Sequence, residues 1–195
     1  MPTLLSVIDR LLDRGFVASI AILVTLGFLV YFNALGLPFV HDDIVFIQQN
    51  PNIQRWDNLT DAFFRPAIPQ FFQGLVTPYY RPVLEVVYRL EFLLFGFHPA
   101  GYHFINILIH VVNGLLFYGI MRRISQARKM SLVAAAIFLV HPVQTEAVAC
   151  VSGISNVMCA FFMMLAFDGY LRAQQWRCAH QMLWLAYALM MFAVA

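Results

Sequence analysis

Two adjacent carboxylates, Asp42 and Asp43, come directly after a long apolar segment and follow His41. Such a pair beside a membrane helix is costly unless it is hydrated, paired or bound to a cation. Carboxylates are ligands for Mg²⁺ or Mn²⁺, and either one could act as a general base toward a hydroxyl group. The pair is therefore either a catalytic or metal-binding site at the mouth of a cavity, or the start of a hydrated loop.

A third carboxylate, Glu146, lies in the segment from His141 to Glu146 and is the only acid between residues 91 and 168. A single carboxylate among apolar residues at membrane depth indicates a functional site. We expect His141 and Glu146 to lie on the same side of the membrane as Asp42 and to help form one cavity. The alternative is a re-entrant turn whose polar groups cap helix ends.

A candidate phosphate ligand, Arg81, directly precedes Pro82, and proline is typical of the first turn of a helix. A guanidinium group next to the free N–H groups of a helix N-terminus suits a phosphate. The run Tyr79-Tyr80-Arg81 fits equally well an interfacial aromatic belt in which the arginine snorkels toward water. Both interpretations stay open.

Four polar residues in one apolar segment are spaced by three, four and three positions, namely His103, Asn106, His110 and Asn113. At 100° per residue they fall within an arc of roughly 80° on a helix. Polar groups inside a membrane face protein or a water-filled cavity. The stripe is therefore expected to join helices by hydrogen bonds, or else to line a substrate cavity.

The elements that carry these residues are apolar. Hydrophobic residues make up 62% of the 195 positions and charged residues only 11%, which excludes a disordered chain, a nucleic-acid binder and an ordinary cytosolic enzyme. We expect an all-α polytopic membrane helix bundle with about five transmembrane helices. The expected spans are residues 16–38, 103–121, 131–141 continuing to about 149, 155–171 and 180–195, the last one incomplete.

The basic residues orient this bundle. They stand before the first span, between the second and third, and between the fourth and fifth: Arg10, Arg14, Arg122, Arg123, Arg128, Lys129, Arg172 and Arg177. The positive-inside rule then gives a cytoplasmic N-terminus. The loop over residues 36–101 would face the periplasm or extracellular side of a bacterial membrane, or the lumen of the eukaryotic endoplasmic reticulum.

The segment from Pro82 to Phe97 has apolar residues at helical spacing but also three charges. Treating it as a span would move the basic cluster at residues 122–129 to the outside, against the positive-inside rule. We therefore predict an amphipathic helix at the outer membrane surface. Within it, Glu85 and Arg89 are four residues apart and are expected to pair.

Four short motifs, taken together and in order, resemble a known family, the transmembrane and tetratricopeptide-repeat O-mannosyltransferases and their bacterial membrane relatives. The motifs are Phe39-Val40-His41-Asp42-Asp43 with Asn50, Tyr80-Arg81-Pro82, the segment from Gly96 to His103 with Asn106 and His110, and the segment from His141 to Ala149. The resemblance implies a C-type membrane glycosyltransferase fold, of which residues 1–195 would be the N-terminal part. Further membrane helices and tetratricopeptide repeats would follow.

The resemblance also implies an activity: transfer of a mannose-like hexose from a polyprenyl-phosphate donor to a hydroxyl group of a protein or other acceptor, on the extracytoplasmic face of the bilayer. The acidic motif of the family corresponds to Asp42 and Asp43, which we expect to supply the base and to hold a divalent ion if Mg²⁺ or Mn²⁺ is needed. Donor phosphate would meet Arg81, His141 and Glu146, in a cavity lined by His103, Asn106 and His110. No nucleic acid is expected as a partner.

Three other functions stay open. One is a membrane anchor or scaffold for C-terminal repeats. Another is a transporter, which the position of the acids at the membrane boundary disfavours. The third is an inactive, truncated paralogue, because Ile154 stands in the turn where relatives often have an arginine.

Overall fold

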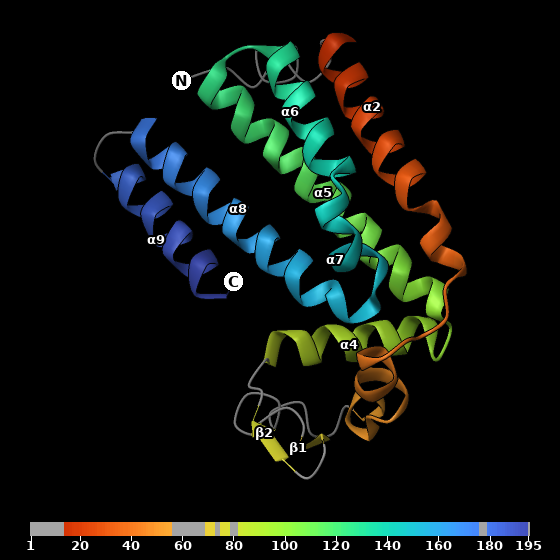
Figure 1. The fold of residues 1–195 in the computed structure, drawn as a ribbon. Coiled ribbons are helices and arrows are strands. Elements are labelled where there is room, and N and C mark those ends of the chain that lie inside the picture. The colour runs from red at the N-terminus through yellow and green to blue at the C-terminus, as the bar shows by residue number, and fades with distance from the viewer. Residues whose placement is uncertain (1–13, 56–68, 73–74, 79–81, 176–178, 195) are drawn as a thin grey trace.

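The computed structural model describes residues 14–55, 69–72, 75–78, 82–175 and 179–194. This part of the chain is predominantly helical (Figure 1). Its long helices are α2 (Arg14–Tyr31), α4 (Pro82–Phe95), α5 (Pro99–Ser125), α6 (Arg128–Val140), α8 (Ile154–Gln175) and α9 (Ala179–Val194). Short helices are η1 (Phe32–Gly36), η2 (Ile44–Gln48), η3 (Pro51–Gln54), η4 (Pro142–Gln144), α7 (Thr145–Ala149) and η5 (Val151–Gly153).

The candidate membrane spans of the structure lie where the sequence predicts them. Three described stretches are long and apolar enough to cross a membrane: Arg14–Gly36, Pro99–Ser125 and Val151–Gln174. A fourth arises if Arg128–Val140 and Pro142–Ala149, which are bent by 46°, form one span. The described residues thus hold three or four candidate spans, and the fifth expected span, which was expected to be incomplete, corresponds to α9 with 16 residues. A helix of that length rises about 24 Å, less than the ~30 Å of the hydrocarbon core.

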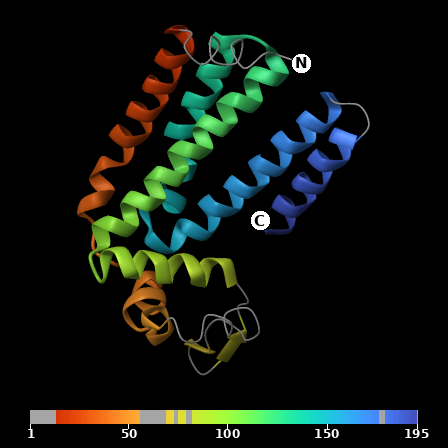
Figure 2. The same cartoon turned by 180° about the vertical axis from the view of Figure 1, so that it is seen from behind.

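Glycines let three of the helices approach closely. A Cβ atom on Gly27 of α2 would lie 2.6 Å from Val111 of α5, and one on Gly114 of α5 would lie 2.5 Å from Leu139 of α6. Small residues at such positions are typical of helix packing in membranes, where close contact replaces the hydrophobic effect. As a result α2, α5 and α6 lie side by side, while α8 and α9 form a pair on the other flank (Figures 1 and 2).

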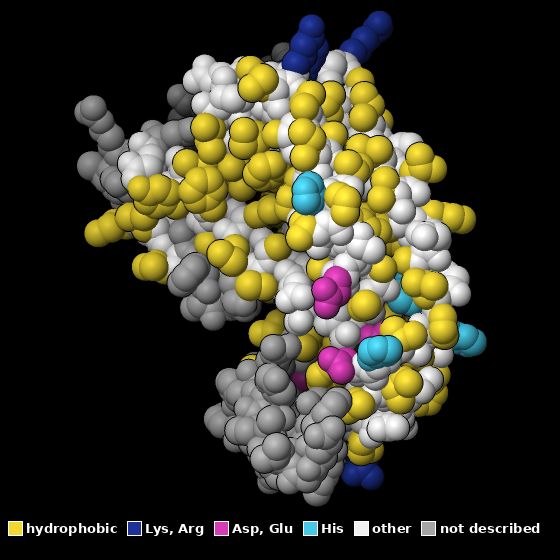
Figure 3. Space-filling view, in the orientation of Figure 1, with side chains coloured by type: hydrophobic (Ala, Val, Ile, Leu, Met, Phe, Trp, Pro, Cys, Tyr) yellow, Lys and Arg dark blue, Asp and Glu magenta, His cyan; other side chains and the backbone are white. Residues whose placement is uncertain are grey.

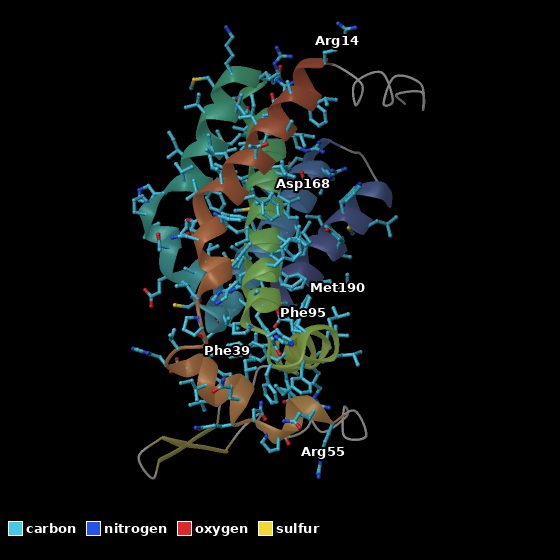
Figure 4. All side chains as sticks on the ribbon, turned by 90° about the vertical axis from the view of Figure 1, so that its right-hand side faces the viewer. Arg14, Phe39, Arg55, Phe95, Asp168 and Met190 are labelled. Carbon is cyan, nitrogen blue, oxygen red and sulfur yellow. The ribbon has the colours of Figure 1, made fainter. Side chains whose placement is uncertain are left out.

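One end of the bundle collects the basic residues of the predicted cytoplasmic segments, and we call it the basic end. The described residues of this set are Arg14, Arg122, Arg123, Arg128, Lys129 and Arg172. The Arg128 guanidinium lies against the backbone of Gly15, which brings α6 to the start of α2. Asp168 of α8 pairs with Arg123 at 2.8 Å and with Arg172 at 2.6 Å. Figure 4 shows Arg14 and Asp168 toward this end and Phe39 and Arg55 toward the opposite, loop end.

The helix α4 lies across the loop end, beneath the other helices (Figures 1 and 2). It is a separate short helix, as predicted, and its apolar residues Leu93 and Leu94 are exposed. Its charged residues are buried against the protein, and Glu85 accepts a hydrogen bond from Arg89 at 2.5 Å. The predicted pair is therefore confirmed. An exposed apolar face is what a helix resting on a lipid surface needs.

A β-hairpin in the outer loop was not predicted. Strands β1 (Pro69–Phe72) and β2 (Leu75–Pro78) pair antiparallel, with Phe72 opposite Leu75 and Pro69 opposite Pro78. The expected all-α fold class is confirmed by the long helices, and the hairpin is a local addition to it in the outer loop. Four-residue strands are too short to give a readable alternation of apolar and polar residues.

Candidate functional site

Asp43 is buried and joins two distant parts of the chain. Its Oδ2 accepts a hydrogen bond from the Val40 N–H at 3.1 Å, and its Oδ1 accepts one from the Ser152 N–H at 2.7 Å, across 109 residues of sequence. The Asp43 N–H in turn donates to the Val40 carbonyl. Hydrogen bonds to an ionised acceptor are the strong kind. The carboxylate therefore fastens the outer loop to the turn before α8.

Asp42, by contrast, is exposed. The neighbouring His41 has a left-handed backbone with φ of 48°, which costs a residue with a side chain on the order of 1–2 kcal/mol. The Val40–Asp43 turn holds this conformation in place. The two acids of the motif thus point different ways: Asp43 into the protein and Asp42 out of it.

Glu146 lies near the same turn. It is exposed in the first turn of α7, and its charge acts on the thiol of Cys150. Burial raises the pKa of Cys150, and the negative charges of Asp43, Glu146 and Asp42 raise this pKa further, in that order. The carboxylates of Asp43, Glu146 and Asp42 thus all lie close enough to Cys150 to affect its thiol.

His141 lies at the bend between α6 and η4. Its Nδ1 accepts a hydrogen bond from the Val143 N–H at 3.2 Å, and Pro142 occupies the first turn of η4. The side chain thus caps a helix, which the re-entrant interpretation predicted. The neutral ring then carries its proton on Nε2. His141 is exposed, so this N–H faces outward. The third predicted donor ligand, Arg81, lies outside the described residues.

The polar stripe of α5 joins helices and loops, as predicted. Asn106 donates through Nδ2 to the Cys150 carbonyl at 2.6 Å, and Asn113 donates through Nδ2 to the Val157 carbonyl at 2.8 Å. Nε2 of His110 lies 3.1 Å from the Leu139 carbonyl. Asn106 therefore holds the same turn that Asp43 holds, from the other side.

His103 is buried next to the backbone of Leu37 and Ala149, and the charge of Asp43 acts on its ring. It stands between the end of the first span and the segment that carries Glu146. Of the two histidines of the stripe, His103 is the one on which the charge of Asp43 acts.

Sequence reasoning identified a turn at Ile154 but missed the contact between its Ser152 N–H and Asp43. The Ser152 N–H is a backbone group, and no side-chain pattern identifies it. Gly153 could have pointed to it, because a Cβ atom there would lie 2.3 Å from the Ala147 carbonyl oxygen. Only glycine permits this close approach. Gly153, seven residues after Glu146, was therefore the feature of the sequence that could have indicated this close backbone contact.

A metal centre is not assembled from the described side chains. Among the described residues, no group of three or more His, Cys, Asp and Glu side chains is placed to hold a metal ion. Both oxygens of Asp43 already accept N–H groups. Asp42 is then the member of the pair with freely accessible oxygens, and other ligands would have to come from a bound substrate.

Glu91 of α4 is the unexpected acid of the loop end. It is 3% exposed, and neither of its carboxylate oxygens has a hydrogen-bond partner. Burial raises its pKa from 4.5 to about 8. The side chain is therefore protonated at neutral pH, whereas Glu85 six residues earlier is paired with Arg89.

The stability of the protein should therefore fall as pH rises from about 4.5 to about 8. Over this range the folded state keeps a proton on Glu91 that the unfolded state has released, which costs about 1.4 kcal/mol per pH unit. Above pH 8 both states are ionised and the slope ends. We expect Glu91→Gln to remove this slope and to raise the melting temperature of the complete protein in detergent at pH 8.

The matched control for this measurement is Glu85→Gln on the same helix. It breaks a buried ion pair and leaves Arg89 with an uncompensated charge, so it should lower the melting temperature. A Glu91→Gln variant whose pH dependence equals that of the unchanged protein would contradict a protonated Glu91.

The amino-acid sequence is similar to those of several animal protein O-mannosyl-transferases. The chain is 32% identical over 167 residues to the mouse protein O-mannosyl-transferase TMTC1 (Mus musculus), 36% over 150 residues to the human TMTC4 (Homo sapiens), and 32% over 159 residues to Tmtc2 of Drosophila melanogaster. These matches cover 83%, 69% and 78% of this chain but 17%, 20% and 16% of the relatives. The chain thus spans about a fifth of their length.

No protein-family model matches the chain, and no solved structure matches it closely enough to indicate a relationship. The family of this chain is therefore shown by its curated relatives. The chain is a homologue of the TMTC protein O-mannosyl-transferases and corresponds to their N-terminal part.

Proposed function

We propose that this chain is the N-terminal part of a membrane glycosyltransferase. The complete protein would move a mannose-like hexose from a polyprenyl-phosphate donor to a hydroxyl group of a protein or other acceptor. One observation carries the proposal: exposed Asp42 sits beside a buried Asp43 whose carboxylate binds the Ser152 N–H, in the turn that follows Glu146. Two motifs far apart in sequence thereby become one site.

In the proposed reaction, Asp42 takes the proton of the acceptor hydroxyl. The oxygen attacks the anomeric carbon from the face opposite the phosphate, and the bond between that carbon and the phosphate oxygen breaks with inversion. Polyprenyl phosphate leaves with the bonding electron pair. This leaving group is already stable as an anion, so protonation by an acid is needed less than in glycoside hydrolysis. Stabilising its charge is the larger task.

Donor phosphate is assigned to the groups on the other side of the turn. His141 uses Nδ1 to accept the Val143 N–H, which leaves the Nε2–H group to donate to a phosphate oxygen. Arg81 would add a guanidinium group, and Glu146 would orient these cationic or donating groups. From α5, Asn106 supports the turn at Cys150, His103 lies next to the backbone of Ala149, and His110 contacts the Leu139 carbonyl at the end of α6.

The active face is proposed to be extracytoplasmic. Arg122, Arg123, Arg128 and Lys129 lie at the end of the bundle opposite Asp42, and basic residues of this kind mark the cytoplasmic side. The site would then face the periplasm of a bacterium or the lumen of the endoplasmic reticulum.

The test is a transfer assay with the complete purified protein, polyprenyl-phosphate mannose and a serine- or threonine-containing peptide. We expect the peptide to gain one hexose by mass, and nucleoside-diphosphate mannose to give no product. Absence of any transfer from the lipid donor, by protein that is folded by melting temperature, would favour the anchor or inactive-paralogue functions.

The same assay in excess EDTA distinguishes a role of Asp42 as a base from a role as a metal ligand. We expect transfer to continue, because Asp43 offers no further oxygen and a single carboxylate is a weak ligand set. If transfer stops and Mg²⁺ or Mn²⁺ restores it, Asp42 holds a metal together with donor phosphate oxygens. The base role would then be the one rejected.

A further inference from the structure

Arg89 is a buried cation of α4 to which the proposed reaction gives no role. Its side chain is 2% exposed and is among the largest fully buried side chains of the described chain. A cation inside a protein is costly unless ion pairs and hydrogen bonds satisfy it. The groups that satisfy Arg89 are therefore expected to be held in fixed places around it.

Two acceptors from different parts of the chain meet the Arg89 guanidinium. Its Nη2 donates to Oε1 of Glu85 at 2.5 Å, one turn earlier on α4. Its Nη1 donates to the Arg55 carbonyl at 2.6 Å, across 34 residues of sequence. A guanidinium group presents its N–H donors in a rigid plane, so one arginine can fix two acceptors relative to each other. Arg89 thus fastens the backbone at Arg55 to α4.

The segment that ends at Arg55 is the one that follows the acidic motif. We call residues 44–55 the loop segment; it contains η2 and η3, and η3 lies against α4 (Figures 1 and 2). Ile47 and Ile53 of this segment are fully buried in one apolar cluster with residues of α4. The loop segment and α4 therefore pack as one unit, and Arg89 supplies its polar contact.

The loop segment begins directly after Asp42 and Asp43. The Ile44 N–H donates to the His41 carbonyl at 3.3 Å, so a shift of the segment moves the backbone that carries Asp42. Asp42 is exposed, in the half of the molecule toward the loop end, where Figure 3 shows acidic side chains at the surface. The segment is held at its start by the bond from Asp43 to Ser152 and at its end by Arg89.

We propose that Arg89 is a positioning residue for sugar transfer: by holding the Arg55 carbonyl, it fixes the loop segment and thereby the place of the Asp42 carboxylate. The inference rests on the proposed function, in which Asp42 takes the proton of the acceptor hydroxyl. A displacement of about 1 Å at a reacting group can cost about 10²-fold in rate. Glu85 keeps the guanidinium group in place and acts one step further from the reaction.

The test replaces the ion pair by apolar side chains in the complete protein, with Glu85→Leu and Arg89→Met together. Such an exchange of a buried ion pair is often neutral or stabilising, whereas the Arg55 carbonyl loses its donor. We expect the melting temperature to be kept and kcat to fall about 10–100-fold. The KM for the lipid donor should stay the same, because the groups assigned to the donor phosphate lie outside the loop segment.

The matched control is Asp168→Asn with Arg172→Gln. These two substitutions remove another ion pair between residues four apart, on α8 at the basic end. They should leave kcat unchanged. A loss of kcat in the control equal to that of the Glu85→Leu and Arg89→Met variant would overturn the proposal.

Hydrogen exchange of backbone amides gives a measurement that needs no activity. Within the loop segment the Gln49 N–H donates to the Ile44 carbonyl at 2.8 Å, and the Arg55 N–H donates to the Asn52 carbonyl at 3.2 Å. Exchange in this segment should accelerate when Arg89 is replaced, because its local opening becomes easier. Unchanged exchange would mean that Arg89 does not hold the segment, and unchanged kcat would mean that holding it does not matter for transfer.

Combination with Asp42→Asn distinguishes positioning from support of the fold. If Arg89 acts through Asp42, the loss from replacing the ion pair should nearly vanish in the Asp42→Asn protein, because residues that act as a unit are not additive. A residue that merely stabilises the fold would give losses that multiply. Multiplied losses would therefore contradict the proposal.

Arg89→Lys serves if the apolar variant does not fold. Lysine keeps the charge beside Glu85 but lacks the rigid fork that reaches two acceptors, so kcat should fall here too, and exchange in the loop segment should accelerate. A lysine variant that matches the unchanged protein in both respects would overturn the proposal. If the unchanged protein transfers no sugar although Arg89 protects the segment, the proposed function itself is wrong, and no reaction is left for Arg89 to position.

Discussion

Exchange of Asp42 for Asn in the complete protein is expected to lower the rate of sugar transfer by about 10²–10⁴-fold, with little change in melting temperature. An amide cannot take the proton of the acceptor hydroxyl, so the chemical step loses its base. The side chain is exposed, and surface substitutions of this kind usually change stability by no more than about 0.5 kcal/mol. The measurement is the rate of hexose transfer at saturating donor and acceptor.

Asp42→Glu is the variant that tests the chemistry behind this expectation. It keeps a carboxylate and moves it outward by one methylene group, so it should retain more activity than Asp42→Asn. If Asp42→Asn and the unchanged protein transfer sugar equally fast, Asp42 is not the base. A loss of melting temperature equal to that of a core variant would show that Asp42 supports the fold instead.

Much of the architecture follows from the sequence because membrane helices leave a strong signal. Long apolar segments predicted α2, α5 and α8, and the spacing of Glu85 and Arg89 predicted their pair. The basic residues predicted one shared end, and the ion pairs of Asp168 agree with it. Such features depend on residue type and local spacing, which one sequence contains.

Other features depend on contacts between distant segments and were therefore missed. Asp42 and Asp43 are identical in type and adjacent in sequence, and only the position of the Ser152 N–H makes one of them buried. The charges of α4 could be placed on one side of the helix, but their burial against the protein depends on what α4 covers. Glu91 looked like any charge on a surface helix, yet it is buried without a partner.

The second large effect is expected from Asp43→Asn, which should destabilise the site rather than remove its base. Asn offers one oxygen and one NH₂ group, whereas Val40 and Ser152 both present an N–H group to Asp43. One of these N–H groups would lose its acceptor and face another donor inside the protein. The cost of a lost hydrogen bond to a charged group is about 1.5–3 kcal/mol, with a further penalty for the unsatisfied group. We expect a lower melting temperature and much slower sugar transfer.

Cys150 reports this change directly. Burial and the charges of Asp43, Glu146 and Asp42 keep its pKa high, so the thiol reacts slowly at pH 8. Asp43→Asn removes the strongest of these charges and loosens the turn that buries the thiol, so alkylation of Cys150, followed by mass spectrometry of its peptide, should accelerate.

Asp42→Asn should accelerate alkylation less, because Asp42 exerts the weakest of the three effects and does not bind the turn. Equal alkylation rates in both variants would mean that Asp43 does not hold the turn at Ser152. The two motifs would then not be joined through this carboxylate. In that case the proposed site would lose the contact that places Asp42 next to Glu146.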